Sequence, residues 1–218
     1  MEVTFRKPVT ADIPFLAETA IQAEKAGSDI LSYTTIFGLE EAQAKKCIIE
    51  MMEEEMDSCC EYSISSFVVA EHNGKIVGAT CAWAEAVDGM PSSMQKGNLL
   101  RFSIPKENFE KAIPLSPLLR ELHIEFFTDS IHMGLAYVAP EMRGQGLVGR
   151  MFRLRIDELK AENPEIKHVY LQVFKNNVSG IRAYERFGFK IVDTKVSANP
   201  HIANYLPSDT KYLMKYTF

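Results

Sequence analysis

The stretch AYVAPEMRGQGLVGR, residues 136–150, decides the fold. It begins in a run of apolar and aromatic residues, turns at Pro140 and carries three glycines into a segment with helical spacing of apolar residues. Leu147, Met151 and Leu154 form one row of that segment, as on the buried face of an amphipathic helix. The stretch therefore predicts a strand over 132–139, a tight loop and a helix over 145–161.

The glycine loop has the properties of an anion site. Backbone N–H groups at a helix start have no intrahelical acceptor, and the helix dipole adds positive partial charge there. Glycine leaves these amides accessible to an anion, and Arg143 and Arg150 supply positive charge nearby. On these residues alone, a structural turn into a helix remains an alternative interpretation.

Other phosphate-binding motifs fit the loop less well. A Walker A loop ends in Gly-Lys-Ser/Thr, whereas the sequence at 149–151 is Gly-Arg-Met. Residues 144–149 formally match the dinucleotide fingerprint G-x-G-x-x-G. The following strand, 168–174, lacks the acidic residue expected about 20 residues on. A nicotinamide-dependent reductase is therefore a weak alternative.

The rest of the chain alternates between predicted strands and helices. Residues 87–130 are rich in proline and glycine, with a helical patch near 118–126, and are predicted to be an insertion. The pattern predicts a single α/β domain over 1–218, in which helices flank a mixed sheet. The other predicted strands are 3–6, 66–71, 75–86, 168–174, 189–196 and 211–218, and the other predicted helices are 10–27, 38–62 and 178–187.

Composition narrows the class of function. The net charge of −5 argues against a nucleic-acid binder with a broad basic surface. The N-terminus lacks the apolar core of a signal peptide, and no run approaches 18 apolar residues, so we expect a cytoplasmic protein without membrane attachment. The four cysteines lack C-x-x-C spacing, and the acidic run at 53–57 is typical of a solvated helix face, so we expect no metal.

Two spaced motifs resemble those of the GNAT superfamily of N-acetyltransferases. The first is a strand, Val-x-Pro, and then Arg-x-x-Gly-x-Gly/Ala leading into a helix, which matches residues 138–148. The second matches NNVSGIRAYERFGF at 176–189, with Asn177, Tyr184 and a Gly-Phe pair. The resemblance is firm over 132–195 and looser over 1–25 and 66–85.

The resemblance implies a mostly antiparallel, mixed sheet of about six to seven strands, splayed between its central strands. It also implies acetyl-CoA as co-substrate, with its pyrophosphate at the helix start and its pantetheine arm along the splayed strand. Val148 departs from the motif, because a β-branched side chain stands where Gly or Ala is usual and can crowd the pyrophosphate. The implied cofactor-binding residues are Ala136, Tyr137, Val138, Arg143, Gly144, Gln145, Gly146, Leu147, Val148, Gly149, Arg150 and Asn177.

The resemblance also assigns the chemistry. Tyr184 occupies the position of the acid that protonates the leaving thiolate. A protonated amine at pH 7 costs roughly 4.6 kcal/mol to deprotonate, so a general base is expected. His132 is one candidate, because simple alternation places it on the same strand face as Ala136 and because histidine titrates near neutrality. Glu85 and Glu125 are rival bases.

We therefore expect an N-acyltransferase that moves an acetyl group from acetyl-CoA to a primary amine of a small molecule or peptide. The alternative is a non-catalytic acyl-CoA-binding or sensor protein of the same fold. The acceptor is not identified by the sequence, although the segments 26–62 and 87–130 are where acceptor specificity usually resides. A homodimer is compatible with these expectations.

Overall fold

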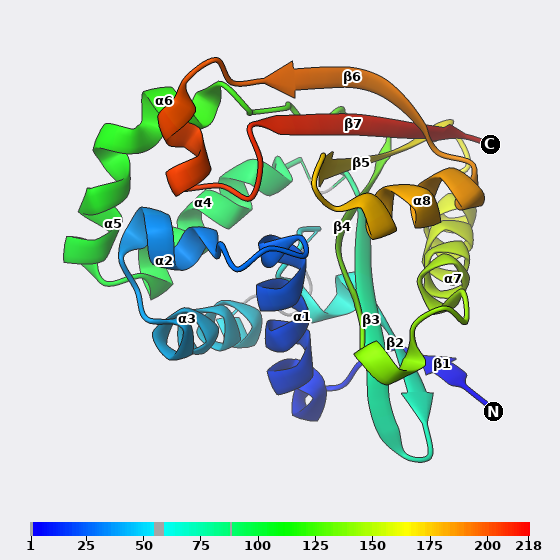
Figure 1. Ribbon diagram of the computed structural model, residues 1–218. Coiled ribbons are helices and arrows are strands. Elements are labelled where there is room, and N and C mark those ends of the chain that lie inside the picture. The colour runs from blue at the N-terminus through cyan, green and yellow to red at the C-terminus, as the bar shows by residue number, and fades with distance from the viewer. Residues whose placement is uncertain (1, 55–58, 88) are drawn as a thin grey trace.

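A computed structural model describes residues 2–54, 59–87 and 89–218. Seven strands form one sheet in the order β1-β2-β3-β4-β5-β7-β6 (Figure 1). Among the described strands, β4 and β5 are parallel, and all other neighbouring strands are antiparallel. The predicted mixed, mostly antiparallel sheet is confirmed. The strands are β1 Thr4–Arg6, β2 Phe67–His72, β3 Lys75–Ala84, β4 Ile131–Val138, β5 His168–Phe174, β6 Lys190–Val196 and β7 Thr210–Thr217.

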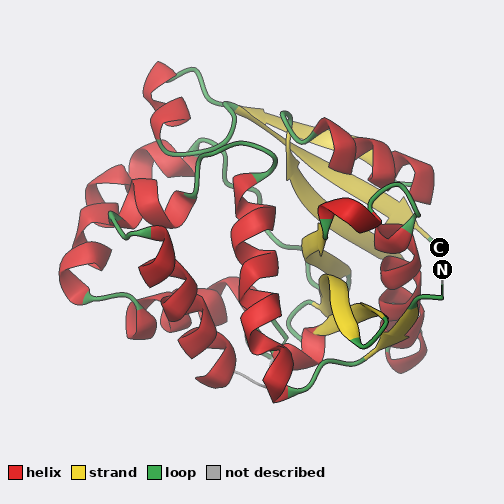
Figure 2. Ribbon diagram, turned by 60° about the horizontal axis from the view of Figure 1, so that its bottom comes forward, coloured by secondary structure: helices red, strands yellow, loops and turns green. Residues whose placement is uncertain are grey.

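Helices cover both faces of this sheet (Figure 2). In Figure 1, α1 to α3 lie to one side of the long β3 strand, and α7 and α8 lie to the other. The α-helices are α1 Ile13–Lys25, α2 Ser32–Phe37, α3 Glu41–Glu54, α4 Ser92–Ser103, α5 Lys106–Ala112, α6 Ser116–Arg120, α7 Leu147–Glu162 and α8 Val178–Phe187. Short 3-10 helices are η1 Thr10–Asp12, η2 Ile64–Ser66, η3 Ile113–Leu115, η4 Pro140–Met142 and η5 Pro200–Asn204.

The alternation of side chains along β3 explains why helices cover both faces. Cys81 and Trp83 pack into the apolar cluster that contains α1 and α3. Ala82 and Ala84 face the cluster that contains α7 and β5. Because successive strand residues point to opposite faces, a strand that is apolar throughout must be covered twice.

Two helical regions differ from the prediction. Gly38 takes a left-handed conformation with φ of 65° and ends α2, so the helix predicted over 38–62 begins only at Glu41. It is helical to Glu54, residues 55–58 lie outside the described part, and residues 59–62 form turns. Three helices, α4 to α6, occupy much of the predicted insertion. Its prolines at 91, 105 and 117 stand at helix starts, where proline is well tolerated, instead of interrupting helices.

The central strands separate partway along their length. β4 and β5 pair at Ile131–Val169, His132–Tyr170 and Met133–Leu171, and no further pair follows on β4. Opposite Cys81, β4 carries a bulge, because Thr80 pairs with Ala136 whereas Ala82 pairs with Met133. A bulge bends the strand and increases its twist. The predicted splay between the central strands is therefore present, and it begins directly after Met133.

The separation leaves backbone groups of β4 without a strand partner. The N–H of Ala139 donates to the carbonyl of Val77 at 2.9 Å, so it faces β3. Because strand amides alternate in direction, the backbone groups of Ala136 and Val138 face the opening. The Val138 carbonyl accepts a hydrogen bond from Arg143 Nε at 3.0 Å. The N–H and carbonyl of Ala136 are thus the pair presented to a ligand.

The bulge depends on a glycine, which gives a first prediction. A Cβ at Gly134 would lie 2.8 Å from Trp83 Cζ3 and 2.9 Å from Cys81 Sγ. Both neighbours are fully buried, so Gly134→Ala is expected to lower the free energy of unfolding by about 1–3 kcal/mol through overpacking. Urea unfolding monitored by fluorescence measures this loss.

Gly97→Ala is the matched control, because Gly97 lies inside α4 and a Cβ there has no neighbour within 4 Å. We expect it to raise the free energy of unfolding by about 0.5–1 kcal/mol. Equal stability changes in the two variants would contradict the packing described at Gly134.

Candidate active site

A cavity of about 750 Å³ lies where α1, the end of β4, the glycine loop and α8 meet. Eleven of the predicted site residues line it: Ala136, Tyr137, Val138, Arg143, Gly144, Gly146, Leu147, Val148, Gly149, Asn177 and Tyr184. Sequence reasoning missed its walls on α1 and α8, which include Gln22, Gly27, Ser179, Ala183, Arg186 and Phe187. The positions on α8 lie within the second motif but were given no role there, whereas Gln22 and Gly27 belong to no motif.

The glycine loop leaves the first amides of α7 uncapped. Gly144 and Gly146 have φ of 79° and 70°, a region in which side chains other than glycine are strained. Gly146 is the N-cap residue, and no side chain caps the helix. The first intrahelical bond runs from Arg150 N–H to the Gly146 carbonyl at 3.1 Å. The N–H groups of the three preceding residues therefore have no acceptor in the helix and suit an anion.

The basic residues of this region divide into two groups. Arg143 lines the cavity, as does Arg186 at the end of α8. Arg150 does not line it, because its guanidinium lies over the Phe5 ring at 4.5 Å. Gln145 also lies outside the lining, with Nε2 3.8 Å from Met142 Sδ. Contact of Gln145 and Arg150 with a cofactor stays a prediction that this geometry does not favour.

Val148 is accommodated by packing. Its half-buried side chain contacts both the cluster of α7 with β5 and the cluster of α7 with β2. A valine at this position therefore adds apolar contact between the helix and the sheet. It also lines the larger cavity, so its effect on a bound pyrophosphate stays a prediction.

A second, smaller cavity of about 190 Å³ adjoins the first at the separated strands. The two share five lining residues: Ala23, Ala26, Ala136, Asn177 and Tyr184. Three of these are alanines, and the other two, Asn177 and Tyr184, bring polar groups to the junction. A ligand in the larger cavity can therefore reach a ligand in the smaller one beside Ala136.

Tyr184 and Asn177 come to this junction from α8. Asn177 is the N-cap of α8 and accepts a hydrogen bond from the Gly180 N–H at 3.0 Å, which fixes the start of the helix. Tyr184 is buried and packs its ring on Phe152, with ring centroids 5.7 Å apart. Burial raises the pKa of Tyr184 to about 12, so its hydroxyl keeps its proton at neutral pH.

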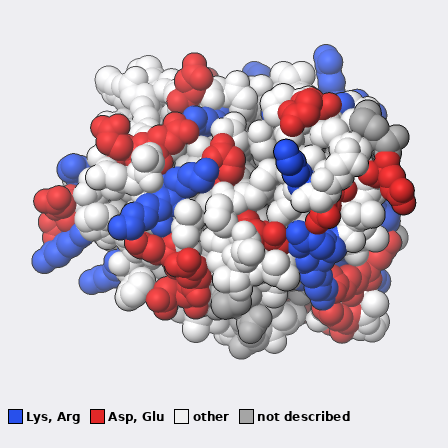
Figure 3. All heavy atoms as spheres, turned by 90° about the horizontal axis from the view of Figure 1, so that it is seen from below, with Lys and Arg blue, Asp and Glu red and all other residues white. Residues whose placement is uncertain are grey.

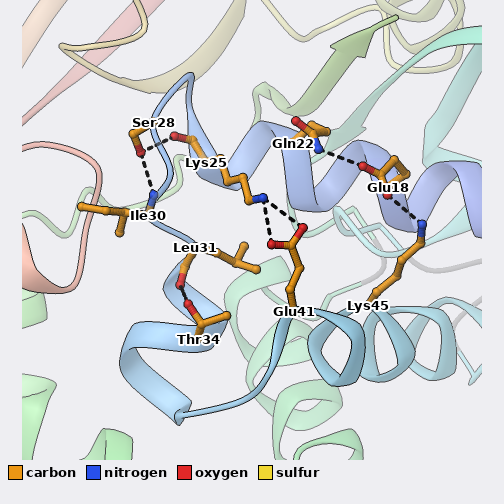
Figure 4. Close-up of polar contacts among 9 residues, drawn as sticks. All are labelled: Glu18, Gln22, Lys25, Ser28, Ile30, Leu31, Thr34, Glu41 and Lys45. Carbon is orange, nitrogen blue, oxygen red and sulfur yellow. Dashed lines mark hydrogen bonds and ion pairs between the residues drawn. The ribbon is translucent and has the colours of Figure 1, made fainter.

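The end of α1 is fixed against its neighbours. Ion pairs join Lys25 to Glu41 at 2.9 Å and Lys45 to Glu18 at 2.7 Å, and so tie α1 to α3 (Figure 4). The carbonyl of Ala26 accepts a hydrogen bond from Asn176 Nδ2 at 3.2 Å, which connects α1 to the loop before α8. These contacts hold the alanines of α1 beside the junction of the cavities.

The smaller cavity contains four charged side chains. Glu61 and Lys96 form an ion pair, and Lys96 lies over the Tyr62 ring at 5.7 Å. Burial alone would lower the pKa of Lys96, but nearby carboxylates outweigh it and hold that pKa above its ordinary value. The other two charged groups are Glu24 of α1 and Lys211 of β7. Trp83 and Phe126 supply aromatic walls.

The three predicted bases lie outside both cavities among the described residues. His132 is fully buried, and its Nε2 accepts a hydrogen bond from the Phe127 N–H at 3.0 Å. Glu85 is buried and accepts hydrogen bonds from Trp83 Nε1 at 2.7 Å and from Ser92 Oγ at 2.6 Å. Glu125 is 84% exposed and pairs with His123. The expected alternation from His132 to Ala136 does not hold, because the bulge inserts a residue between them.

Other classes of site lack support in the described part of the chain. No group of three or more metal-ligating side chains occurs among residues 2–54, 59–87 and 89–218. Within the same residues, no helix has the length and apolar character needed to cross a bilayer. Acidic and basic side chains are interspersed on the face shown in Figure 3, without a continuous basic stripe there.

Comparison with known proteins relates this geometry to a family. Residues 35–189 match the model of the Acetyltransferase (GNAT) family. A Bacillus subtilis protein described as "Spermine/spermidine N(1)-acetyltransferase" is 39% identical over 54 residues, which are 25% of this chain. The match spans about a third of that relative, 35% of its length.

Solved structures share the fold at low sequence identity. An N-acetyltransferase from Staphylococcus aureus Mu50 aligns with a TM-score of 0.66 and 13% identity over 98% of this chain and 100% of that one. The Drosophila melanogaster polyamine N-acetyltransferase aligns with a TM-score of 0.58 and 14% identity over all of both chains. The family model covers well over half of the chain, and the chain therefore belongs to the GNAT family of acetyltransferases.

Proposed function

We propose that this chain transfers an acetyl group from acetyl-CoA to a primary amine of a small molecule or peptide. The observation that carries the proposal is the meeting of two cavities beside the unpaired backbone of Ala136, with Tyr184 in the wall of both. The larger cavity suits the donor and the smaller one the acceptor. Direct transfer requires this arrangement, because both substrates must be held together.

The residues around the larger cavity fit acetyl-CoA. The uncapped amides at the start of α7, together with Arg143 and Arg186, suit its phosphates. The N–H and carbonyl of Ala136 suit the pantetheine amides, which would add to the open edge of β4 as a strand does. When bound, acetyl-CoA supplies a thioester carbon that the amine attacks, so that a C–N bond forms and the C–S bond breaks.

Tyr184 is proposed as the acid for the leaving sulfur. The thiolate released when the C–S bond breaks needs a proton, and Tyr184 lines both cavities. Because burial raises its pKa to about 12, the phenol is fully protonated before each turnover. The proton lost by Tyr184 is restored from solvent after the product leaves.

Glu24 is proposed as the acceptor of the amine proton. It and Glu61 are the carboxylates that line the smaller cavity in the described part of the chain. Glu61 is engaged by Lys96, whereas Glu24 accepts a hydrogen bond from Ser32 Oγ at 2.7 Å and forms no ion pair among the described residues. A carboxylate in this position can take the proton directly or through water.

His132 remains a predicted base, but its surroundings favour a positioning role. Its ring contacts Phe126 edge-on with centroids 4.8 Å apart, and Phe126 in turn forms part of the smaller cavity. Burial lowers the pKa of His132 to about 4, so the imidazole is neutral at physiological pH. We propose that it holds the segment 126–127 in place through the Phe127 N–H.

The acid assignment and the base assignment each make a kinetic prediction. With acetyl-CoA and an amine panel that includes spermidine, Tyr184→Phe should lower kcat about 10²-fold, because the thiolate loses its proton donor. Glu24→Gln should lower kcat at pH 7 and recover towards pH 10, where the amine is already neutral. Release of free CoA thiol, followed over this pH range, measures both effects.

Tyr216→Phe and Glu162→Gln are matched controls, since both residues lie outside the two cavities. Both should retain normal kcat. Wild-type kcat in Tyr184→Phe would contradict the acid assignment, and a pH-independent loss in Glu24→Gln would contradict the base assignment. Binding of acetyl-CoA without thiol release for any amine would instead support a non-catalytic acyl-CoA-binding protein.

The environment of His132 predicts a pH effect on stability. The unfolded chain takes up a proton on this histidine below about pH 6.5, whereas the folded chain does so only near pH 4. The unfolded state thus binds more protons between these values, so the free energy of unfolding decreases as the pH is lowered from 7 towards 4. His132 should cost about 2 kcal/mol of unfolding free energy between pH 7.5 and pH 5.

Urea unfolding of the wild type and of His132→Gln at both pH values measures this cost. The variant should lose about 2 kcal/mol less than the wild type on acidification. His201→Gln, at an exposed position, is the control and should behave as the wild type does. An identical pH dependence in wild type and His132→Gln would show that the imidazole titrates freely.

A further inference from the structure

Lys211 is a half-buried cation whose charge the mechanism above does not use. Its Nζ lies 3.2 Å from Gln172 Oε1 and 5.2 Å from the centroid of the Phe174 ring. Gln172 is itself oriented, because its Nε2 donates to the Ile124 carbonyl at 3.0 Å. The site therefore provides Lys211 with one neutral acceptor and an aromatic face, and Lys211 forms no ion pair among the described residues.

The charges that line the smaller cavity do not all cancel locally. Glu61 neutralises Lys96 within an ion pair. Glu24 and Lys211 remain, and they are not within ion-pair distance of each other. One negative and one positive group therefore face the cavity separately, from α1 and β7. A ligand with one cationic and one anionic end complements such a pair, whereas a ligand with only cationic ends does not.

We infer that the acceptor is a small amino acid-type molecule, whose carboxylate binds Lys211 and whose amine faces Glu24. The inference rests on the proposed function, since it identifies the acceptor of that reaction. A carboxylate at Lys211 would form a charge-assisted hydrogen bond in a site removed from water. Burial also lowers the pKa of Lys211 to about 8, and an anionic ligand would reverse part of that shift.

The size of the cavity agrees with a compact acceptor. Its volume of about 190 Å³ is about a quarter of the 750 Å³ of the larger cavity. The walls formed by Trp83 and Phe126 are apolar and can contact the methylene groups between the two charged ends. A long polycation would place a further ammonium group close to Lys211 or Lys96, where like charges repel.

The test compares amines that differ only in the carboxylate. 4-Aminobutyrate is paired with 1-aminopropane and lysine with 1,5-diaminopentane, within a panel of α- and ω-amino acids that also contains spermidine. We expect kcat/KM to be at least about tenfold higher for carboxylate-bearing members, the effect of about 1.4 kcal/mol of binding. Lys211→Met should remove this ratio by raising KM for those members, while KM for acetyl-CoA stays unchanged.

Lys215→Met is the matched control, because Lys215 lies on the same strand but outside both cavities, over the Tyr170 ring. It should keep the preference for the carboxylate. A preference for the carboxylate-free amines or spermidine, or a preference that persists in Lys211→Met, would overturn the inference.

Calorimetric binding of the same pairs in the presence of CoA separates the two proposals. Lys211-dependent binding of the amino acids without any thiol release would overturn the proposed function, while it would support the recognition of a ligand carboxylate by Lys211. Turnover of carboxylate-free amines alone would support the proposed function and overturn the inference. The absence of amino acid binding in the wild type would also overturn it.

Discussion

The loss of pairing between β4 and β5 after Met133 is the constraint on which the rest of the site depends. A continuous ladder here would bury the backbone groups of Ala136 in the sheet and close the space between the two cavities. The bulge opposite Cys81 provides the bend, and Gly134 permits it because a side chain there would collide with Trp83. One register change in a strand therefore produces both an open hydrogen-bonding edge and a passage between cavities.

The helices that follow the two separated strands place the remaining groups around this opening. β4 leads into the glycine loop and α7, whose uncapped amides face the larger cavity. β5 leads into α8, which brings Asn177 and Tyr184 to the junction. The two strands thus lead to the proposed phosphate-binding amides of α7 and to the proposed acid, Tyr184, at different places around the larger cavity. The location of these groups follows from the sheet topology, because ligands of sheets with parallel strands bind beyond the carboxyl ends of those strands.

Local motifs predicted the glycine loop and the start of α8 from the sequence. The φ values of Gly144 and Gly146 and the N-cap at Asn177 each depend on residues close in the sequence, so the pattern of residue types is sufficient to indicate them. The element types of the sheet were also predictable, because strand alternation and helix periodicity are local properties. Short helices such as α2, and helices that begin at a proline, could not be predicted from these local patterns.

The smaller cavity, which we propose binds the acceptor, could not be predicted in the same way. Glu24, Glu61, Lys96 and Lys211 come from four distant parts of the chain and meet only in the fold. His132 was placed by alternation along β4, which a bulge of one residue interrupts, and its depth depends on aromatic side chains around it. Ionic partners and burial are non-local properties, so a single sequence carries little signal for either.

Amide hydrogen exchange of Ala136, followed by NMR with and without CoA, tests the central claim most directly. The account predicts that the Ala136 amide exchanges at least about tenfold faster than that of Tyr137, which faces β3, and becomes protected when CoA binds. The amides paired at Met133 and before it should be protected in both states. An Ala136 amide that is already protected without ligand, or that CoA leaves unchanged, would contradict the account.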